Sequence, residues 1–237
     1  MTSIQSATVE TWKSDISMAH DSGIDAFVLN IGSDSWQPAR VSDAYSAALA
    51  LGLPFKLCMS FDMTVLPSDA SALIGYVHEY AKHPNQLLRD GKPFVTTFAG
   101  ETAFWGPDGW KTQVLQPLSD SGTPVFFSPA AFISPEEATG AWGGVLDGLV
   151  TWNSGWPLSL TSAALGMVGQ TGALATDVLG KVKSAIGSLD PDTPFINAFK
   201  GTGKAYIASV SPFFFTHYSP QSFNKNVSSF SQHPVIC

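Results

Sequence analysis

The feature that most constrains this chain is a repeated alternation of short apolar runs with segments of helical periodicity. In the first helical segment, Val9, Trp12, Ile16 and Ala19 recur on one face, and Gly23 follows as the expected C-cap. Near-continuous apolar runs are typical of strands buried on both faces, and their alternation with helices predicts a parallel sheet. The six runs expected as strands are residues 25–32, 55–62, 92–101, 124–129, 145–153 and 205–212. Further helices are expected around residues 40–50, 68–82, 108–120 and 171–186, with a loop at 187–204.

The size of the chain fits this pattern. Its 237 residues are close to the roughly 250 of one (β/α)8 barrel, and no linker divides them. A net charge of −7 argues against nucleic acid or an anionic membrane as the main partner, because both require a basic surface. Only 13% of residues are charged and 12% are aromatic, which suits a neutral polymer such as a glycan. The alternative is that the rings fill the core, as we expect for most of the Phe residues.

The cysteines, the histidines and the N-terminus bear on whether the chain is a disulfide-rich, metal-binding, membrane or secreted protein. The two cysteines are widely spaced, so neither a disulfide framework nor a zinc pattern is expected; Cys58 reads as a buried small hydrophobe and Cys237 as a free thiol. The five histidines give no metal-ligand spacing, and we expect no metal and no cofactor. No apolar stretch is long enough for a membrane span, and residues 1–6 lack a signal-peptide pattern, which by itself indicates a cytosolic protein.

Polar or small residues follow each predicted strand, where parallel α/β proteins place their functional groups. Asp62 ends the second run, and alternation puts it on the same face as Cys58 and Ser60, toward the barrel axis. Glu101 ends the third run, so the two carboxylates are candidates for the acid and base of glycosyl hydrolysis. The alternative for Asp62 is a helix-capping or loop aspartate, and the sequence favours neither interpretation over the other. The alternative for Glu101 is a solvated loop residue.

Aromatic residues lie at or beyond several strand ends. Trp105, Trp152 and Trp156 are expected either to stack on sugar rings or to pack beneath loops. His217 and Tyr218 follow the last apolar run, where a lone histidine is more often a scaffold residue than a catalyst. The chain has no Gly-x-Ser-x-Gly elbow, no Gly-x-x-x-x-Gly-Lys loop and no His-Glu-x-x-His motif.

Several strings, taken in order, resemble glycoside hydrolase family 71, the fungal α-1,3-glucanases or mutanases. The strings are Trp12-Lys-Ser-Asp15-Ile, Gly23-Ile-Asp25-Ala-Phe-Val-Leu-Asn30-Ile-Gly32, Phe55-Lys-Leu, Ser60-Phe-Asp62, Gly91-Lys-Pro-Phe-Val-Thr-Thr-Phe98, Asp147-Gly-Leu, Thr151-Trp152, Trp156-Pro157, Val210-Ser-Pro212-Phe-Phe-Phe-Thr-His217-Tyr218 and Asn224-Lys-Asn226. They cover most of residues 8–226, with 158–203 matching least well.

This resemblance implies a (β/α)8 TIM-type barrel that hydrolyses α-1,3-glucan with inversion and without a cofactor. Asp62 matches an aspartate implicated in activity, and Asn30 matches a strand-end asparagine. The substrate-binding residues it suggests, together with neighbouring strand-end positions, are Asn30, Trp105, Trp152, Asn153, Trp156, His217 and Tyr218. The family is secreted or associated with the cell wall, which differs from the location that the N-terminus indicates.

The chain also departs from the family pattern. The family's opening strand, with an Ala-His-Phe/Tyr-like motif, and its last strand, with a Trp-Asn-Asp-x-x-Glu-Ser-like motif that supplies the principal catalytic pair, find no match. We therefore expect residues 1–226 to form an incomplete barrel and residues 227–237 an aberrant, unstructured tail. Two exposed sheet edges would make the isolated chain unstable, and we expect little or no glucanase activity from it.

Four functions are compatible with these patterns: an α-1,3-glucan hydrolase, a non-catalytic glucan-binding pseudoenzyme, a gene-model fragment without function, and another sugar-processing barrel such as an inactive chitinase relative. The absence of a closely spaced Asp-x-Asp-x-Glu run argues against the last.

Overall fold

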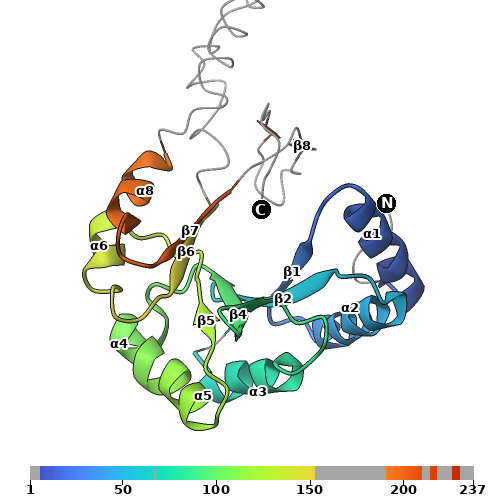
Figure 1. Cartoon of the computed structure of the whole chain (residues 1–237), viewed down its shortest axis with the longest axis horizontal. Coiled ribbons are helices and arrows are strands. Elements are labelled where there is room, and N and C mark those ends of the chain that lie inside the picture. Colours follow the sequence, from blue (N-terminus) through green and yellow to red (C-terminus); the bar gives the residue numbers. More distant parts are fainter. Residues whose placement is uncertain (1–5, 67, 153–190, 210–213, 218–225, 230–237) are drawn as a thin grey trace, which may run out of the picture. The chain divides into compact units, whose positions relative to one another are not determined.

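The computed structural model describes residues 6–66, 68–152 and 191–209 and the backbone of residues 214–217 and 226–229 (Figure 1). The chain divides into two units, residues 1–150 with 203–205 and residues 151–202 with 206–236. In the described ranges, no helix combines the length and hydropathy needed to span a bilayer.

The first unit is a parallel α/β structure in which each strand lies beside the previous one. Its sheet has the order β1-β2-β4, β5 pairs with the other side of β4, and all three pairings are parallel. A short strand, β3, adds an antiparallel hairpin to the start of β4. The elements are α1 (Val9–Asp21), β1 (Ala26–Ile31), α2 (Gln37–Leu51), β2 (Lys56–Asp62), α3 (Ala70–Tyr80), β3 (Leu88–Arg89), β4 (Lys92–Phe98), a 3-10 turn (Ala103–Trp105), α4 (Pro107–Gly109), a π-helical segment (Trp110–Leu115), α5 (Gln116–Asp120), β5 (Phe126–Phe127), α6 (Pro135–Thr139) and β6 (Gly148–Thr151).

The succession of strands continues beyond β5. Asp147 N donates to Phe127 O at 2.8 Å and Val150 N donates to Pro129 O at 3.0 Å, so β6 follows β5 in the same direction. β6 also pairs with β7 (Ala205–Ala208). A strand order that follows the chain order is what a barrel requires, whereas a doubly wound sheet reverses direction at a switch point.

The helices of the first unit cover one face of this sheet, as Figure 1 shows for α2, α3 and α5. Ring contacts fix the side: Trp12 of α1 with Phe27 (centroids 6.5 Å apart) and Phe61 with Tyr76 of α3 (6.1 Å). The predicted alternation in β2, with Phe61 toward the helices and Ser60 away from them, is confirmed. Cys58 is fully buried, as expected for a small hydrophobe.

Local signals place the helix ends where the pattern predicts them. Gly23 follows α1 with φ +81°, and Ile24 N donates to Ala19 O at 3.0 Å, which closes the last turn. Asp69 is the N-cap of α3, and its carboxylate accepts the N–H of Ala72 at 3.2 Å.

Near the amino ends of the strands, a short segment separates β2 from β4. Leu57 N donates to Asn85 O and Leu87 N donates to Leu57 O, each at 2.8 Å, while Phe94 N donates to Leu87 O at 2.8 Å. The direct β2–β4 ladder therefore starts only at the pair Met59 and Val95.

The second unit holds α8 (Thr193–Phe199) and a separate antiparallel pair, β8 (Phe214–His217) with β9 (Asn226–Ser229). Inside it, the Thr151 and Tyr206 hydroxyls are 2.6 Å apart, and the Tyr206 hydroxyl donates to the buried Asp192 carboxylate. The Tyr206 ring also stacks on Phe195, with centroids 5.9 Å apart, so α8 is packed through this tyrosine.

All six predicted strands are present, but other expectations differ from the structure. Residues 187–204 were expected to form a loop, yet they contain α8, because Pro194 suits a first helical turn and Phe199 is buried. Residues 227–229, expected to be unstructured, lie in β9, where pairing with β8 satisfies their backbone groups. The rest of that tail and the helix predicted at 171–186 lie outside the described residues.

Candidate functional site

The face of the sheet opposite the helices carries a row of polar side chains. Asn30 pairs in register with Ser60, and Ser60 pairs with Thr96, so the three side chains lie side by side across β1, β2 and β4. Ser128, directly after β5, extends the row, because it is two residues beyond Phe126, which pairs with Phe94. Ser60 Oγ donates to Asn30 Oδ1 at 2.8 Å, which fixes the orientation of the exposed asparagine.

A second row lies one step closer to the carboxyl ends of the strands. Asp62 pairs with Phe98, and Phe98 forms a bridge with Ala130. Because the side-chain period of a strand is two, Asp62 is on the same face as Ser60, as predicted. Asp62 therefore stands at the rim of the polar row.

The sequence left Asp62 either as a catalytic carboxylate or as a capping or loop aspartate, and its surroundings have features of both. Its Oδ1 accepts the N–H of Thr64 at 3.1 Å and the Thr64 hydroxyl at 2.5 Å, so this oxygen stabilises the turn after β2. The carboxylate is half-buried. Both bonds are made to Oδ1, and they hold the side chain in one orientation.

Glu101 follows β4 on a turn with unusual backbone angles. Ala99 has φ +57° and Gly100 has φ +106°. A Cβ on Gly100 would lie 2.8 Å from Cγ of Met63, so glycine permits the loop after β2 to contact the loop after β4. Since Met63 follows Asp62 and Gly100 precedes Glu101, the two carboxylates lie on contacting loops. Glu101 Oε2 accepts the N–H of Phe132 at 3.3 Å.

Aromatic rings accompany these carboxylates. Phe98 contacts Phe132 edge-to-face, with ring centroids 5.7 Å apart and an interplanar angle of 89°. Phe132 is 45% exposed, and Trp105 is 88% exposed with φ +63°. The sequence prediction included Trp105 but missed both phenylalanines. Alternation from Thr96 would have placed Phe98 at the rim, whereas no sequence signal marks Phe132.

The other predicted binding residues lie in the second unit or outside the described residues. Trp152 belongs to the second unit and is 45% exposed. His217 lies in β8 of the same unit, and only its backbone is described. Asn153, Trp156 and Tyr218 lie outside the described residues.

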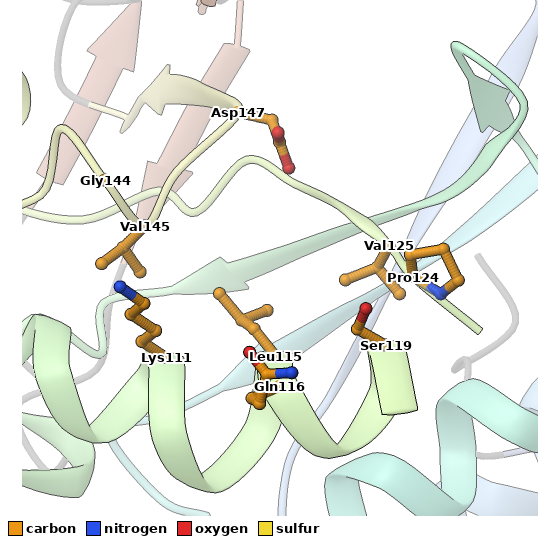
Figure 2. Close-up of a pocket in the computed structure, with 9 residues that line it drawn as sticks. All are labelled: Lys111, Leu115, Gln116, Ser119, Pro124, Val125, Gly144, Val145 and Asp147. Atoms are coloured by element: carbon orange, nitrogen blue, oxygen red, sulfur yellow. The ribbon is translucent and has the colours of Figure 1, made fainter. Parts of the chain in front are cut away.

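A shallow pocket of about 170 Å³ lies at the opposite, amino ends of β5 and β6 (Figure 2). Its lining comes from the π-helical segment and α5 on one side and from the approaches to β5 and β6 on the other. Asp147 stands at its edge and uses Oδ2 to accept the N–H of Phe127 at 2.9 Å. None of the predicted site residues lines this pocket. Among the described residues, His, Cys, Asp and Glu side chains form no group of three or more that is arranged to hold a metal ion.

Burial raises the pKa of one nucleophilic group in this part of the chain. The Cys58 thiol lies beneath the polar row, and burial raises its pKa to about 12. The thiol is therefore protonated at neutral pH and is a packing group, not a nucleophile.

The fold and the rim together define a class: a parallel α/β protein that presents two oriented carboxylates and exposed aromatic rings at the carboxyl ends of its strands. Sequence comparison supplies the family. The model of glycosyl hydrolase family 71 matches residues 1–235, and the chain belongs to this family of glycoside hydrolases.

Named relatives agree with this assignment. The chain is 39% identical over 216 residues to glucan endo-1,3-alpha-glucosidase agn1 of Schizosaccharomyces pombe, covering 90% of this chain and 45% of the relative. It is 30% identical to the ascus wall endo-1,3-alpha-glucanase of the same yeast (93% and 46% covered) and 30% identical to mutanase Pc12g07500 of Penicillium rubens (90% and 41%). The chain thus spans less than half the length of each of these relatives.

A solved structure with a similar fold is the GH99 endo-alpha-mannosidase from Bacteroides thetaiotaomicron. The TM-score is 0.57 at 16% identity, over 91% of this chain and 59% of that one. At this identity the likeness concerns the fold alone.

Proposed function

We propose that this chain takes part in the hydrolysis of α-1,3-glucan and that Asp62 and Glu101 are the carboxylates it contributes. The observation that carries the proposal is their placement on contacting loops above the polar row, in a chain of family 71. The relatives named as α-1,3-glucanases support the choice of linkage.

We further propose that the consecutive parallel strands belong to a (β/α)8 barrel with this rim at its mouth. The chain-order succession from β1 to β6 supports a barrel, since each crossover helix returns the chain to the next position. Asn30, Trp105, Trp152, Asn153, Trp156, His217 and Tyr218 are the binding residues proposed for its cleft. A cell-wall polysaccharide as substrate also favours action outside the cell.

Glycoside hydrolysis requires one of the two carboxyl groups to act as a general acid and the other as a general base. In an inverting reaction one protonates the leaving oxygen while the other activates a water, at a separation of roughly 6.5–9.5 Å. Asp62 and Glu101 each have one oxygen bound to a nearby backbone N–H, so each is oriented while its second oxygen is left for substrate or water. The sparse charge of the chain fits a neutral substrate.

The test is reducing-sugar release from α-1,3-glucan by the 237-residue chain, compared with Asp62→Asn. Release that Asp62→Asn abolishes supports the proposal, and release that the substitution leaves unchanged contradicts it. The α-1,4-linked polymer amylose is the control for linkage.

A second candidate is glucan binding without turnover. The observation in its favour is that both carboxylates serve the fold: Asp62 closes the turn at Thr64, and Glu101 holds the Phe132 backbone. Co-sedimentation with insoluble α-1,3-glucan, without any sugar release, would favour this second function.

A further inference from the structure

Phe132 occupies a fixed position at the carboxyl-end rim. It lies in the three-residue stretch between Ala130 and the N-cap of α6, Ser134. On one side, Ala130 N donates to Thr97 O and Ala99 N donates to Ala130 O, each at 3.0 Å. On the other side, Ser134 and Glu137 form a reciprocal capping box. The stretch is therefore anchored at both ends.

The ring itself is supported from below and remains open above. Phe98 presents its edge-to-face contact to Phe132, and Phe98 is the register partner of Asp62. Despite this support, Phe132 is 45% exposed, so it still presents apolar surface to solvent. Its backbone N–H donates to Glu101 Oε2, so this bond ties the loop that carries the ring to the loop that carries the carboxylate.

We infer that Phe132 is a substrate-positioning residue that packs against one glucosyl ring of the α-1,3-glucan next to the two carboxylates, with Glu101 as the group that holds it in place. This inference rests on the proposed function and names the contact that orients the substrate. Nothing in the sequence pattern pointed to this residue.

The physical reason lies in the surfaces that meet. A glucosyl ring carries C–H groups on its faces and hydroxyls on its edge, so an aromatic face gains apolar contact while the hydroxyls keep their water. A ring that is already immobilised loses little side-chain entropy on binding. The bond to Glu101 fixes the position of the Phe132 ring, because a shift of the Glu101 loop would move the Phe132 backbone with it.

The test measures binding, so that it does not depend on turnover. The probe is an α-1,3-linked glucopentaose titrated into the 237-residue chain by calorimetry, with an α-1,4-linked pentaose as comparison. The variants are Phe132→Ala and Phe132→Tyr, then Glu101→Ala and Glu101→Gln. Leu49→Ala is the matched control, because Leu49 is an exposed apolar side chain on α2.

Phe132→Ala is expected to weaken binding about tenfold, which is the value of one aromatic contact. Phe132→Tyr keeps the ring and should restore affinity to within about twofold. Glu101→Ala removes the acceptor for the Phe132 N–H and should weaken binding about threefold. Glu101→Gln keeps an acceptor oxygen and should bind more tightly than Glu101→Ala. Leu49→Ala should bind as the unaltered chain does.

Two results overturn the inference. Equal affinity of Phe132→Ala and the unaltered chain shows that the ring does not contact the sugar. Equal loss in Phe132→Ala and Phe132→Tyr shows that the effect does not come from the ring face. Either result leaves the proposed function standing, whereas the absence of any binding by the unaltered chain removes both.

Discussion

The two ends of the same parallel strands are built in opposite ways. At the amino ends, the polar groups are buried and bonded to one another, and aromatic rings pack on them. At the carboxyl ends, Ser60, Thr96 and Ser128 are also buried, but Asn30 is exposed beside them, and the aromatic rings of Trp105 and Phe132 on the following loops are exposed. The difference indicates that one end contributes stability, while the other is free to bind a ligand.

The amino-end cluster consists of Tyr45, Gln86, Tyr80 and their neighbours. The buried Tyr45 hydroxyl donates to Gln86 Oε1 at 2.7 Å, and Gln86 Nε2 donates to Leu87 O at 3.0 Å and to Phe94 O at 3.3 Å. Tyr45 stacks on Tyr80 with centroids 4.1 Å apart. Burial raises the pKa of both tyrosines, so neither ionises under ordinary conditions.

The carboxyl-end rim shows the converse arrangement. Ser60 donates to Asn30, Thr64 donates to Asp62 and Phe132 donates to Glu101, while Trp105 and Phe132 are 88% and 45% exposed. Substitutions at the two ends should therefore have different main effects. Those in the amino-end cluster should mainly lower the free energy of unfolding, and those at the rim should mainly change glucan binding or turnover.

The largest expected effect is at the amino end. Tyr45→Ala removes a buried ring from the stack with Tyr80 and leaves Gln86 Oε1 without its donor, so the free energy of unfolding should fall by about 4 kcal/mol. Urea denaturation followed by tryptophan fluorescence measures this. A loss below about 1 kcal/mol would show that the amino-end cluster is not the stabilising one.

The next effect concerns the rim. Asp62→Asn removes the charge needed for proton transfer but keeps an oxygen that accepts the Thr64 N–H. Any sugar release from α-1,3-glucan that the 237-residue chain shows should fall by about a hundredfold, while the free energy of unfolding should change by less than about 0.5 kcal/mol. If instead Asp62→Asn destabilises the fold as Tyr45→Ala does, the contrast between the two ends is wrong.

Alkaline pH should act through Cys58, a buried group on the same face of β2 as Ser60 and Asp62. Burial raises the pKa of the Cys58 thiol from 9.0 to about 12. The protonated Cys58 thiol therefore stabilises the fold fully below pH 9. This contribution is lost between pH 9 and 12, because the thiol of the unfolded chain ionises there while that of the folded chain stays protonated. The free energy of unfolding should fall by about 1.4 kcal/mol per pH unit in this range from this group alone.

Urea titrations at pH 8, 9 and 10 measure this dependence. The comparison is between a Cys237→Ser chain and the same chain carrying Cys58→Ala, which should lose stability less steeply above pH 9. Tyr45, whose pKa burial also raises, adds to the slope of both chains at higher pH. Parallel curves for the two chains would contradict the role assigned to Cys58.

The smallest expected effect is that of a substitution at Ser60, in the polar row below Asp62. Ser60→Ala removes the hydroxyl that donates to Asn30 Oδ1, and the free energy of unfolding should fall by about 1 kcal/mol or less. Glucan affinity should fall with it, because Asn30 loses its fixed orientation. Asn30→Ala is the paired variant: if the two losses add fully in the double variant, the bond does not couple the residues.

Much of the architecture could be predicted from the order of apolar runs. All six strands and the helices in the first 120 residues appear where the periodicity places them, because buried strands and amphipathic helices carry strong patterns. The β3–β4 hairpin was missed although Asp90 and Gly91, with φ +52° and +74°, form the short turn typical of an Asp-Gly pair. The helix α8 was missed because Gly and Pro dominate its surroundings.

The site was predicted less completely. Alternation correctly placed Asp62 on the face opposite the helices, since register follows from the hydrophobic pattern. The contact between the loops of Asp62 and Glu101 depends on Met63 and Gly100, and no local pattern encodes that contact. The expected instability of the isolated chain remains a prediction.

The sequence by itself determined the class of fold and the family, because strand and helix periodicities are local properties and the motif order is preserved along the chain. Only the tertiary structure decided which side chains meet: the register that aligns Asn30, Ser60 and Thr96, and the turn that binds Glu101 to the Phe132 backbone. Such contacts join residues about thirty positions apart, and their geometry follows from packing of whole elements and not from any local preference.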